Sequence, residues 1–218
     1  MIALVRYTVA VLLHTQRHLA PILLFVAFLA VSTVNGEGPL PPVYASSAAA
    51  LFVCTVWLTA VVLGLDAPEQ RAIVVISAGR SATVLAASVL TALLAGTVLG
   101  ALGLVFPLWM GAYDVGGADL VLGAVAELAC ACAGTAAGVL CSRLVILRPG
   151  HALVAALALT GAFLLTRGFP PVNPLIQAMS TTSDASAVLS LATGMLGVAA
   201  VLLASAAAVA QYVSARRD

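Results

Sequence analysis

The chain has 218 residues, of which 63% are hydrophobic and only 8% charged, and its formal net charge is +1. Soluble domains carry about 25% charged residues, so this composition excludes a soluble domain and indicates a membrane protein. All nine basic residues are arginine. Without a lysine, the chain has neither a Walker A phosphate-binding loop nor a side chain for Schiff-base chemistry.

The N-terminal segment, residues 1–18, is apolar but is interrupted by Arg6, His14 and Arg17. On a helix these three side chains share one polar edge, although Leu13 lies on the same edge. We therefore predict an elbow helix that lies along the inner membrane surface. A simple extension of the first span is the alternative, and Pro21 is a candidate for the bend between the two segments.

Six apolar stretches follow that suit helices crossing a hydrocarbon core about 30 Å thick. They cover residues 19–34, 43–65, 83–108, 120–141, 147–166 and 187–213. The first stretch is short, so five spans remain an alternative count, and a cleaved signal peptide is an alternative for this terminus. The apolar character of the preceding segment argues against a signal peptide, whose first region is short and basic. The sequence thus predicts an all-α, polytopic membrane protein with a single transmembrane domain.

The distribution of arginine orients these spans, because arginine is enriched in the short cytoplasmic loops of membrane proteins. With six spans, one side receives Arg6, Arg17, Arg71, Arg80, Arg143, Arg148, Arg216 and Arg217. The other side receives Arg167 together with Glu37, Asp114, Asp119 and Asp184. Five spans would scatter the arginines over both sides. We therefore predict that both termini are cytoplasmic, and the Ala, Val and Arg bias suggests the plasma membrane of a GC-rich bacterium.

The charged segment between the second and third spans has the signals of a short helix. Asp66 and Glu69 match a capping box, Pro68 falls in the first turn, and Gly79 can close the helix. The helix would cover residues 67–78 and measure about 18 Å, which is too short to cross a membrane. We predict a helix on the cytoplasmic face that docks another protein. A plain solvated connector is the alternative.

Glu127 is the one ionisable residue well inside a predicted span. A charge near the centre of a membrane helix costs about 2.5–3.5 kcal/mol on insertion scales, so such a residue is a functional candidate that faces the bundle interior. Alternatively, its side chain reaches the outer water or pairs with Arg167.

Small residues recur inside the spans. Gly96 and Gly100 in the third span, and Gly134 and Gly138 in the fourth, form small-x-x-x-small pairs that we interpret as packing devices. The cysteines, which we interpret as small core residues rather than metal ligands, are Cys54, Cys130, Cys132 and Cys141.

The whole layout resembles the permease subunits of type-2 ABC exporters. The resemblance covers the six spans, the N-terminal elbow, and the Glu-Gln-Arg helix followed by Gly-Arg between spans two and three. It extends to the outer segment TRGFPPVNPLIQAMSTTSDAS, whose Asn173 and Pro174 are similar to the Asn-Pro pair of that family's outer loop.

This resemblance implies a membrane-spanning subunit that pairs with an identical or homologous permease. A separate cytoplasmic ATP-binding cassette subunit would hold ATP and magnesium, so this chain itself needs no cofactor. Residues 67–78 would be the coupling helix, and Glu69, Arg71, Gly79 and Arg80 would transmit the movement of the ATPase. The outer loop, residues 167–186, is expected to re-enter the membrane. An apolar cavity would suit export of an amphipathic or lipid-like substrate.

Other functional classes have weaker support in the sequence. No nucleophile–base pair, aspartate pair or H-E-x-x-H motif lies at membrane depth, so we assign no catalytic residue. The arginines follow topology instead of clustering on one face, which gives no indication of nucleic-acid binding. Two alternatives to the exporter remain: a secondary transporter or channel that uses Glu127, and a non-transporting membrane protein that assembles with another complex.

Overall fold

The computed structural model describes residues 2–34, 36–65, 74, 76, 80–146, 148–182 and 184–216. Of the residues that the structure describes, 84% are helical. The helices are α1 (Ile2–Thr15), α2 (Leu19–Thr33), α3 (Leu40–Leu63), α5 (Ser81–Met110), α6 (Gly117–Leu140), α7 (Pro149–Leu165), α8 (Val172–Thr181) and α9 (Ala185–Ala215). Two short strands, β1 (Glu37–Pro39) and β2 (Ala112–Asp114), pair in parallel.

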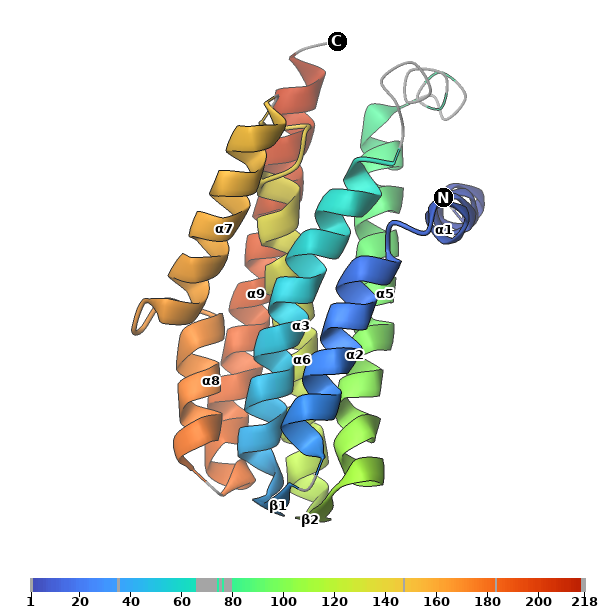
Figure 1. Cartoon of the computed structure of the whole chain (residues 1–218). Coiled ribbons are helices and arrows are strands. Elements are labelled where there is room, and N and C mark those ends of the chain that lie inside the picture. The colour runs from blue at the N-terminus through green and yellow to red at the C-terminus, as the bar shows by residue number, and fades with distance from the viewer. Residues whose placement is uncertain are drawn as a thin grey trace.

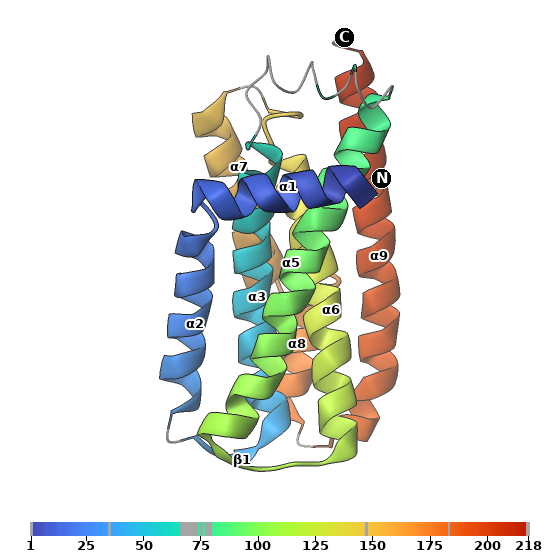
Figure 2. The same cartoon turned by 90° about the vertical axis from the view of Figure 1, so that its right-hand side faces the viewer.

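All helices except α1 run roughly along one axis, and α1 lies across it (Figure 1 and Figure 2). Both termini and α1 lie toward one end of the bundle, which we call the terminal end (Figure 1). The paired strands lie at the opposite end, which we call the strand end. There β1 and β2 tie the α2–α3 connection to the α5–α6 connection, with Glu37 opposite Ala112.

Helices cover all six predicted apolar stretches, and their ends lie within three residues of the predicted ones. Four of them, α3, α5, α6 and α9, are long and apolar enough to cross a membrane, or five if α1 and α2 count as one bent span. The remaining two are shorter than the prediction requires, because α2 has 15 residues and α7 has 17. The structure therefore supports an all-α protein with several membrane-capable helices.

The N-terminal bend is present, but it lies before Pro21. Gln16 has a φ of 55°, and α1 and α2 meet at 77°. His18 Nδ1 lies 2.9 Å from the Leu12 carbonyl oxygen across this turn. The left-handed backbone conformation of Gln16 bends the chain at this point. Pro21 instead lies in the first turn of α2, where proline fits a helix without bending it.

The core of the bundle forms around α6, which packs against α3, α5 and α9. Glycines allow this close packing. A Cβ atom at Gly138 would lie 2.6 Å from the Thr59 Cβ, and one at Gly134 would lie 2.7 Å from the Phe52 carbonyl oxygen. Close approach of helix backbones drives association within membranes. The predicted packing role of these two glycines is confirmed.

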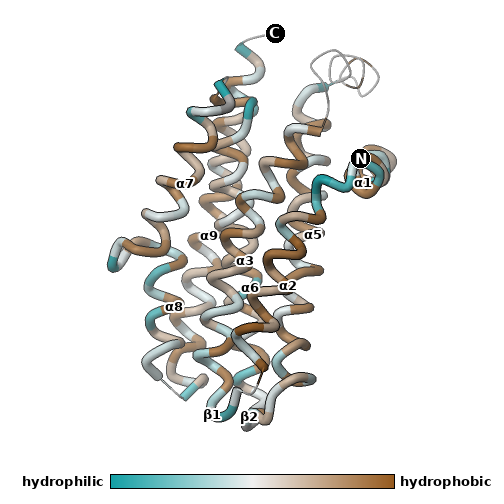
Figure 3. Tube along the Cα trace, viewed as in Figure 1, coloured by the Kyte–Doolittle hydropathy of each residue, from teal (hydrophilic) through white to brown (hydrophobic). Residues whose placement is uncertain are grey.

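The outer surface of the bundle suits hydrocarbon rather than water. Large apolar side chains are exposed on its outer helices, including Val31 on α2, Val98 and Val105 on α5, and Val201 on α9. Figure 3 shows apolar colours along the helix shafts, with hydrophilic residues toward the ends of the bundle and at the break between α7 and α8. Monomeric soluble proteins rarely expose so much contiguous apolar surface.

Candidate functional site

The predicted coupling segment lies almost entirely outside the described residues, and so do Glu69, Arg71 and Gly79. Of this region the structure describes Val74 and Ile76, both helical, and Arg80. Arg80 is exposed and occupies the N-cap position of α5 at the terminal end. Its backbone is extended, with φ −151° and ψ 130°, so the chain changes direction there before α5 begins.

Glu127 lies in the interior of the bundle with only 2% of its surface exposed. It projects from α6 toward α3, where Ser47 Oγ donates a hydrogen bond to its Oε1 at 2.5 Å. Ser47 Oγ also lies 3.1 Å from the Tyr44 carbonyl oxygen. The prediction that Glu127 faces the interior is therefore confirmed, and its side chain does not reach the outer water.

The opposite wall of this site is α5, which approaches closely because it presents glycine. A Cβ atom at Gly103 would lie 2.8 Å from Glu127 Oε1, and one at Gly100 would lie 3.2 Å from the Glu127 Cβ. Phe25 of α2 closes the site, because its ring would lie 3.4 Å from the same Cβ atom at Gly103. A larger residue at Gly103 would displace the carboxyl group, so the glycine creates the space that Glu127 occupies.

The second carboxyl oxygen of Glu127, Oε2, is buried and accepts no hydrogen bond from any residue that the structure describes. Across the described ranges no arginine or histidine forms an ion pair with this carboxyl group, and Arg167 lies exposed in the α7–α8 break. An isolated buried carboxylate is costly, so the site requires neutralisation by a proton or a cation. The alternative pairing of Glu127 with Arg167 is not formed.

A second polar feature is the break at residues 166–171, between α7 and α8. Asn173 is 5% exposed and holds this break together. Its Nδ2 donates to the Leu164 carbonyl oxygen at 2.7 Å, and its Oδ1 accepts from the Gly168 backbone N–H at 3.2 Å. Gly168 has a φ of 76°, which glycine adopts without strain. Asn173 thus satisfies two backbone groups that the interrupted helix leaves free.

Pro174 lies in the first turn of α8, where its lack of an N–H group is harmless. The expected outer loop, residues 167–186, contains the helix α8. Figure 1 shows α8 continuing from α7 toward the strand end. The chain passes from the terminal end to the strand end in two helical pieces, and α9 returns in one.

The sequence did not single out Ser47 or Gly103 as partners of Glu127. Ser47 is 80 residues away from Glu127 in the chain, and no local pattern links the two.

For metal binding, the described part of the chain holds no group of three or more His, Cys, Asp or Glu side chains. Cys54, Cys130 and Cys141 are buried free thiols, Cys132 is partly buried, and Cys54 Sγ lies 3.3 Å from the Pro21 carbonyl oxygen.

Comparisons with known proteins add no assignment. No protein-family model, curated protein or solved structure matches the chain.

Proposed function

We propose that the chain is the membrane-spanning permease subunit of an ATP-driven ABC exporter, working with a separate cytoplasmic nucleotide-binding subunit. The observation that carries this proposal is the layout of the terminal end. The crossing helix α1, the C-terminal end of α3 and the start of α5 with Arg80 all lie toward that end, and so do both termini (Figure 2). A cytoplasmic motor would find its docking elements there on one face.

Charge placement supports the same orientation. Arg143 and Arg148 lie in the connection between α6 and α7, at the terminal end, whereas Glu37, Asp119 and Asp184 lie toward the strand end. An excess of arginine marks the cytoplasmic side of a membrane protein. We infer that the terminal end is cytoplasmic in a bacterial plasma membrane.

Each subunit of the proposed exporter has a separate role. The cytoplasmic subunit binds ATP and magnesium and contacts residues 67–78, with Glu69, Arg71, Gly79 and Arg80 transmitting its closure. A second permease subunit completes the transport path. The substrate is amphipathic or lipid-like, because the helices offer apolar surfaces with few charges.

Purification of the tagged chain from its native host in mild detergent tests the proposal. We expect vanadate-sensitive ATP hydrolysis in the purified complex, and loss of both the activity and the ATPase subunit with Glu69→Ala plus Arg71→Ala. The matched control is Glu37→Ala, which removes an exposed carboxylate at the strand end and should leave the complex intact. Labelling of residues 67–78 from outside the cell, or transport without any ATPase, would refute the proposal.

A second candidate function rests on the unpaired Oε2 of Glu127. A buried carboxyl group that needs neutralisation suits a secondary transporter or channel that binds a proton or cation within the membrane. In liposomes containing a pH-sensitive dye, proton movement without ATP that stops with Glu127→Gln would favour this function. Asp119→Asn at the strand end is the control, because it removes a carboxylate outside the bundle interior.

A further inference from the structure

The hydrogen bonds around Ser47 need one more proton than an ionised Glu127 leaves available. Ser47 Oγ lies 2.5 Å from Glu127 Oε1 and 3.1 Å from the Tyr44 carbonyl oxygen. A serine hydroxyl has one proton to donate, and an ionised carboxylate has none. When Ser47 donates to an ionised Oε1, its contact with the carbonyl oxygen therefore brings two acceptors together with no proton between them.

A proton on Oε1 completes both contacts. Glu127 then donates to Ser47 Oγ, which reverses the direction of that hydrogen bond, and Ser47 donates onward to the Tyr44 carbonyl oxygen. The carboxyl group is now neutral, and Oε2 is the carbonyl oxygen of an acid. A neutral oxygen without a hydrogen bond costs far less in the interior of a protein than an unpaired charge.

The spacing of these oxygens fits a proton and is too short for a shared cation. Oxygens that coordinate one Mg²⁺ octahedrally at about 2.0–2.1 Å lie about 2.9 Å apart, and those around Ca²⁺ lie further from that larger ion. Oε1 and Ser47 Oγ are closer than this, at a distance that hydrogen-bonded oxygens adopt. On the side of Oε2, a Cβ atom at Gly100 would lie 3.9 Å away, so α5 closes that side as well.

The side chains that face Glu127 supply no positive charge. Among the described residues, Tyr44 of α3 and Cys130 of α6 interact with it electrostatically, and neither can become positively charged. From α5 the site receives Gly100 and Gly103. An ionised carboxyl group would therefore stand without a counter-ion in the interior of the bundle, which is the costly state for such a group.

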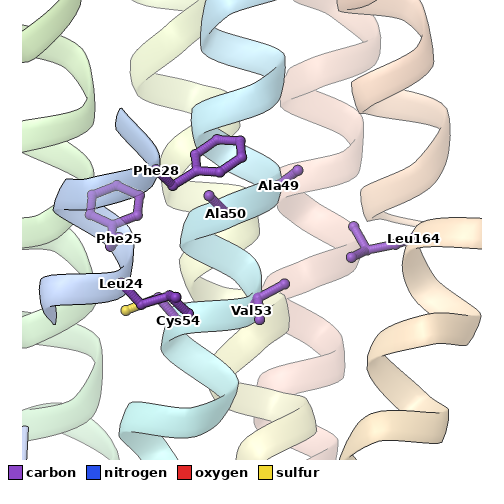
Figure 4. A pocket seen from close by; sticks show the side chains of 8 residues that line it. All are labelled: Leu24, Phe25, Phe28, Ala49, Ala50, Val53, Cys54 and Leu164. Atoms are coloured by element: carbon purple, nitrogen blue, oxygen red, sulfur yellow. The ribbon is translucent and has the colours of Figure 1, made fainter. Parts of the chain in front are cut away.

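The surrounding helices bring no counter-ion either. Phe25 of α2 is 1% exposed and covers the site, and it also lines a groove of about 340 Å³ between α2 and α7 (Figure 4). The other residues that line this groove are uncharged. The titratable side chains within α7 and α9, His151 and Tyr212, lie in the turns at the terminal end, whereas Glu127 lies near the middle of α6.

We propose that Glu127 is a proton-binding site, in which a proton held on Oε1 bridges to Ser47 and links α6 to α3 through the Tyr44 carbonyl oxygen. The ligand is the proton and not a metal cation. Loss of the proton breaks this link and leaves a charge that only water could stabilise. Because Gly103 and Phe25 close the site, water reaches the carboxyl group only when α5 or α2 moves away from it.

This inference deepens the second candidate function and rests on it only in using the same carboxyl group. It names the ligand and the atoms that hold it in the resting protein, so its test needs no transport. A protonated Glu127 without proton movement in liposomes would reject the transporter and leave the site standing. Proton movement with an ionised Glu127 would do the reverse.

Infrared spectroscopy of the purified full chain in lipid at pH 7 tests the proposal. A protonated carboxyl group has a carbonyl stretching band that a carboxylate lacks. The other acidic side chains of the chain lie outside the predicted spans, where glutamate and aspartate are ionised at this pH. We expect the band in the wild type and its loss with Glu127→Gln, which should still fold because an amide N–H can donate to Ser47 Oγ.

Two serine variants test the bridge itself. Ser47→Ala removes the acceptor of the Oε1 proton and should shift the frequency of the band without abolishing it. Ser88→Ala is the matched control, because Ser88 is a buried serine of α5 that bonds to the Val84 carbonyl oxygen of its own helix. It should leave the band unchanged.

Absence of the band from the wild type would overturn the proposal, and so would a band that persists with Glu127→Gln or that Ser47→Ala does not shift. A band that appears only after a bulky organic cation replaces sodium and potassium would show that a cation occupies the site instead.

Discussion

Replacing Asn173 by Ala tests whether the break between α7 and α8 is held together as the structure indicates. The substitution removes the donor to the Leu164 carbonyl oxygen at 2.7 Å and the acceptor for the Gly168 N–H at 3.2 Å. A buried backbone group without a partner costs about 1–3 kcal/mol. Because both hydrogen bonds are only partly buried and the second is the longer one, we expect a total loss of about 2–4 kcal/mol.

For a chain of this size, 1 kcal/mol shifts the melting temperature by about 2–4 °C, so Asn173→Ala should lower it by about 4–16 °C. The assay is thermal unfolding in detergent with a thiol-reactive fluorescent dye. The native chain provides the probes, since Cys54, Cys130 and Cys141 are free and buried and react only on unfolding.

Gln177→Ala is the matched control, because it removes an exposed amide side chain from the same helix. We expect it to shift the melting temperature by less than about 2 °C, as is usual for surface substitutions. If Asn173→Ala behaves like Gln177→Ala, the two hydrogen bonds do not stabilise the break and the reasoning is refuted.

Three further predictions use the same unfolding assay. Gly138→Val should destabilise the bundle by about 1–3 kcal/mol, because the added side chain overpacks against α3. Gly194→Val, at a position with open space, should not destabilise it. Equal effects of the two substitutions would contradict the close approach of α6 to α3 at Gly138. Glu127→Leu should leave stability unchanged or raised, because it removes a buried oxygen without a partner, and a large loss would show that the carboxyl group is needed for folding. Asp184 caps α9, and hydrogen bonds from Ser186 lower the pKa of its carboxyl group. The ionised cap therefore stabilises the fold fully above the ordinary pKa of aspartate. This stabilisation is lost as the pH falls through the lowered pKa. Wild-type protein should therefore lose stability below about pH 4 more steeply than Asp184→Asn, and equal profiles would show that the cap contributes nothing.

Composition and the lengths of the apolar stretches were sufficient to predict an all-α membrane protein and to place its helix ends within three residues. The reason is physical. A backbone surrounded by hydrocarbon must satisfy its hydrogen bonds within the helix, so a long apolar stretch leaves few alternatives. The same principle favoured an interior position for Glu127, because a lone carboxyl group in an apolar helix avoids lipid. It left open whether the side chain reaches the outer water or pairs with Arg167, and the tertiary structure decided for the interior.

The partners of these residues were decided only by the tertiary structure. Helices such as α3 and α5 are apolar on every face, so no periodic pattern reveals which side turns inward or which helix lies opposite. The contact between Ser47 and Glu127 therefore had no signal in the sequence. The break after α7 was equally hidden. It is held together by the hydrogen bond from Asn173 to the Leu164 carbonyl oxygen, which is a consequence of packing and not of local preference.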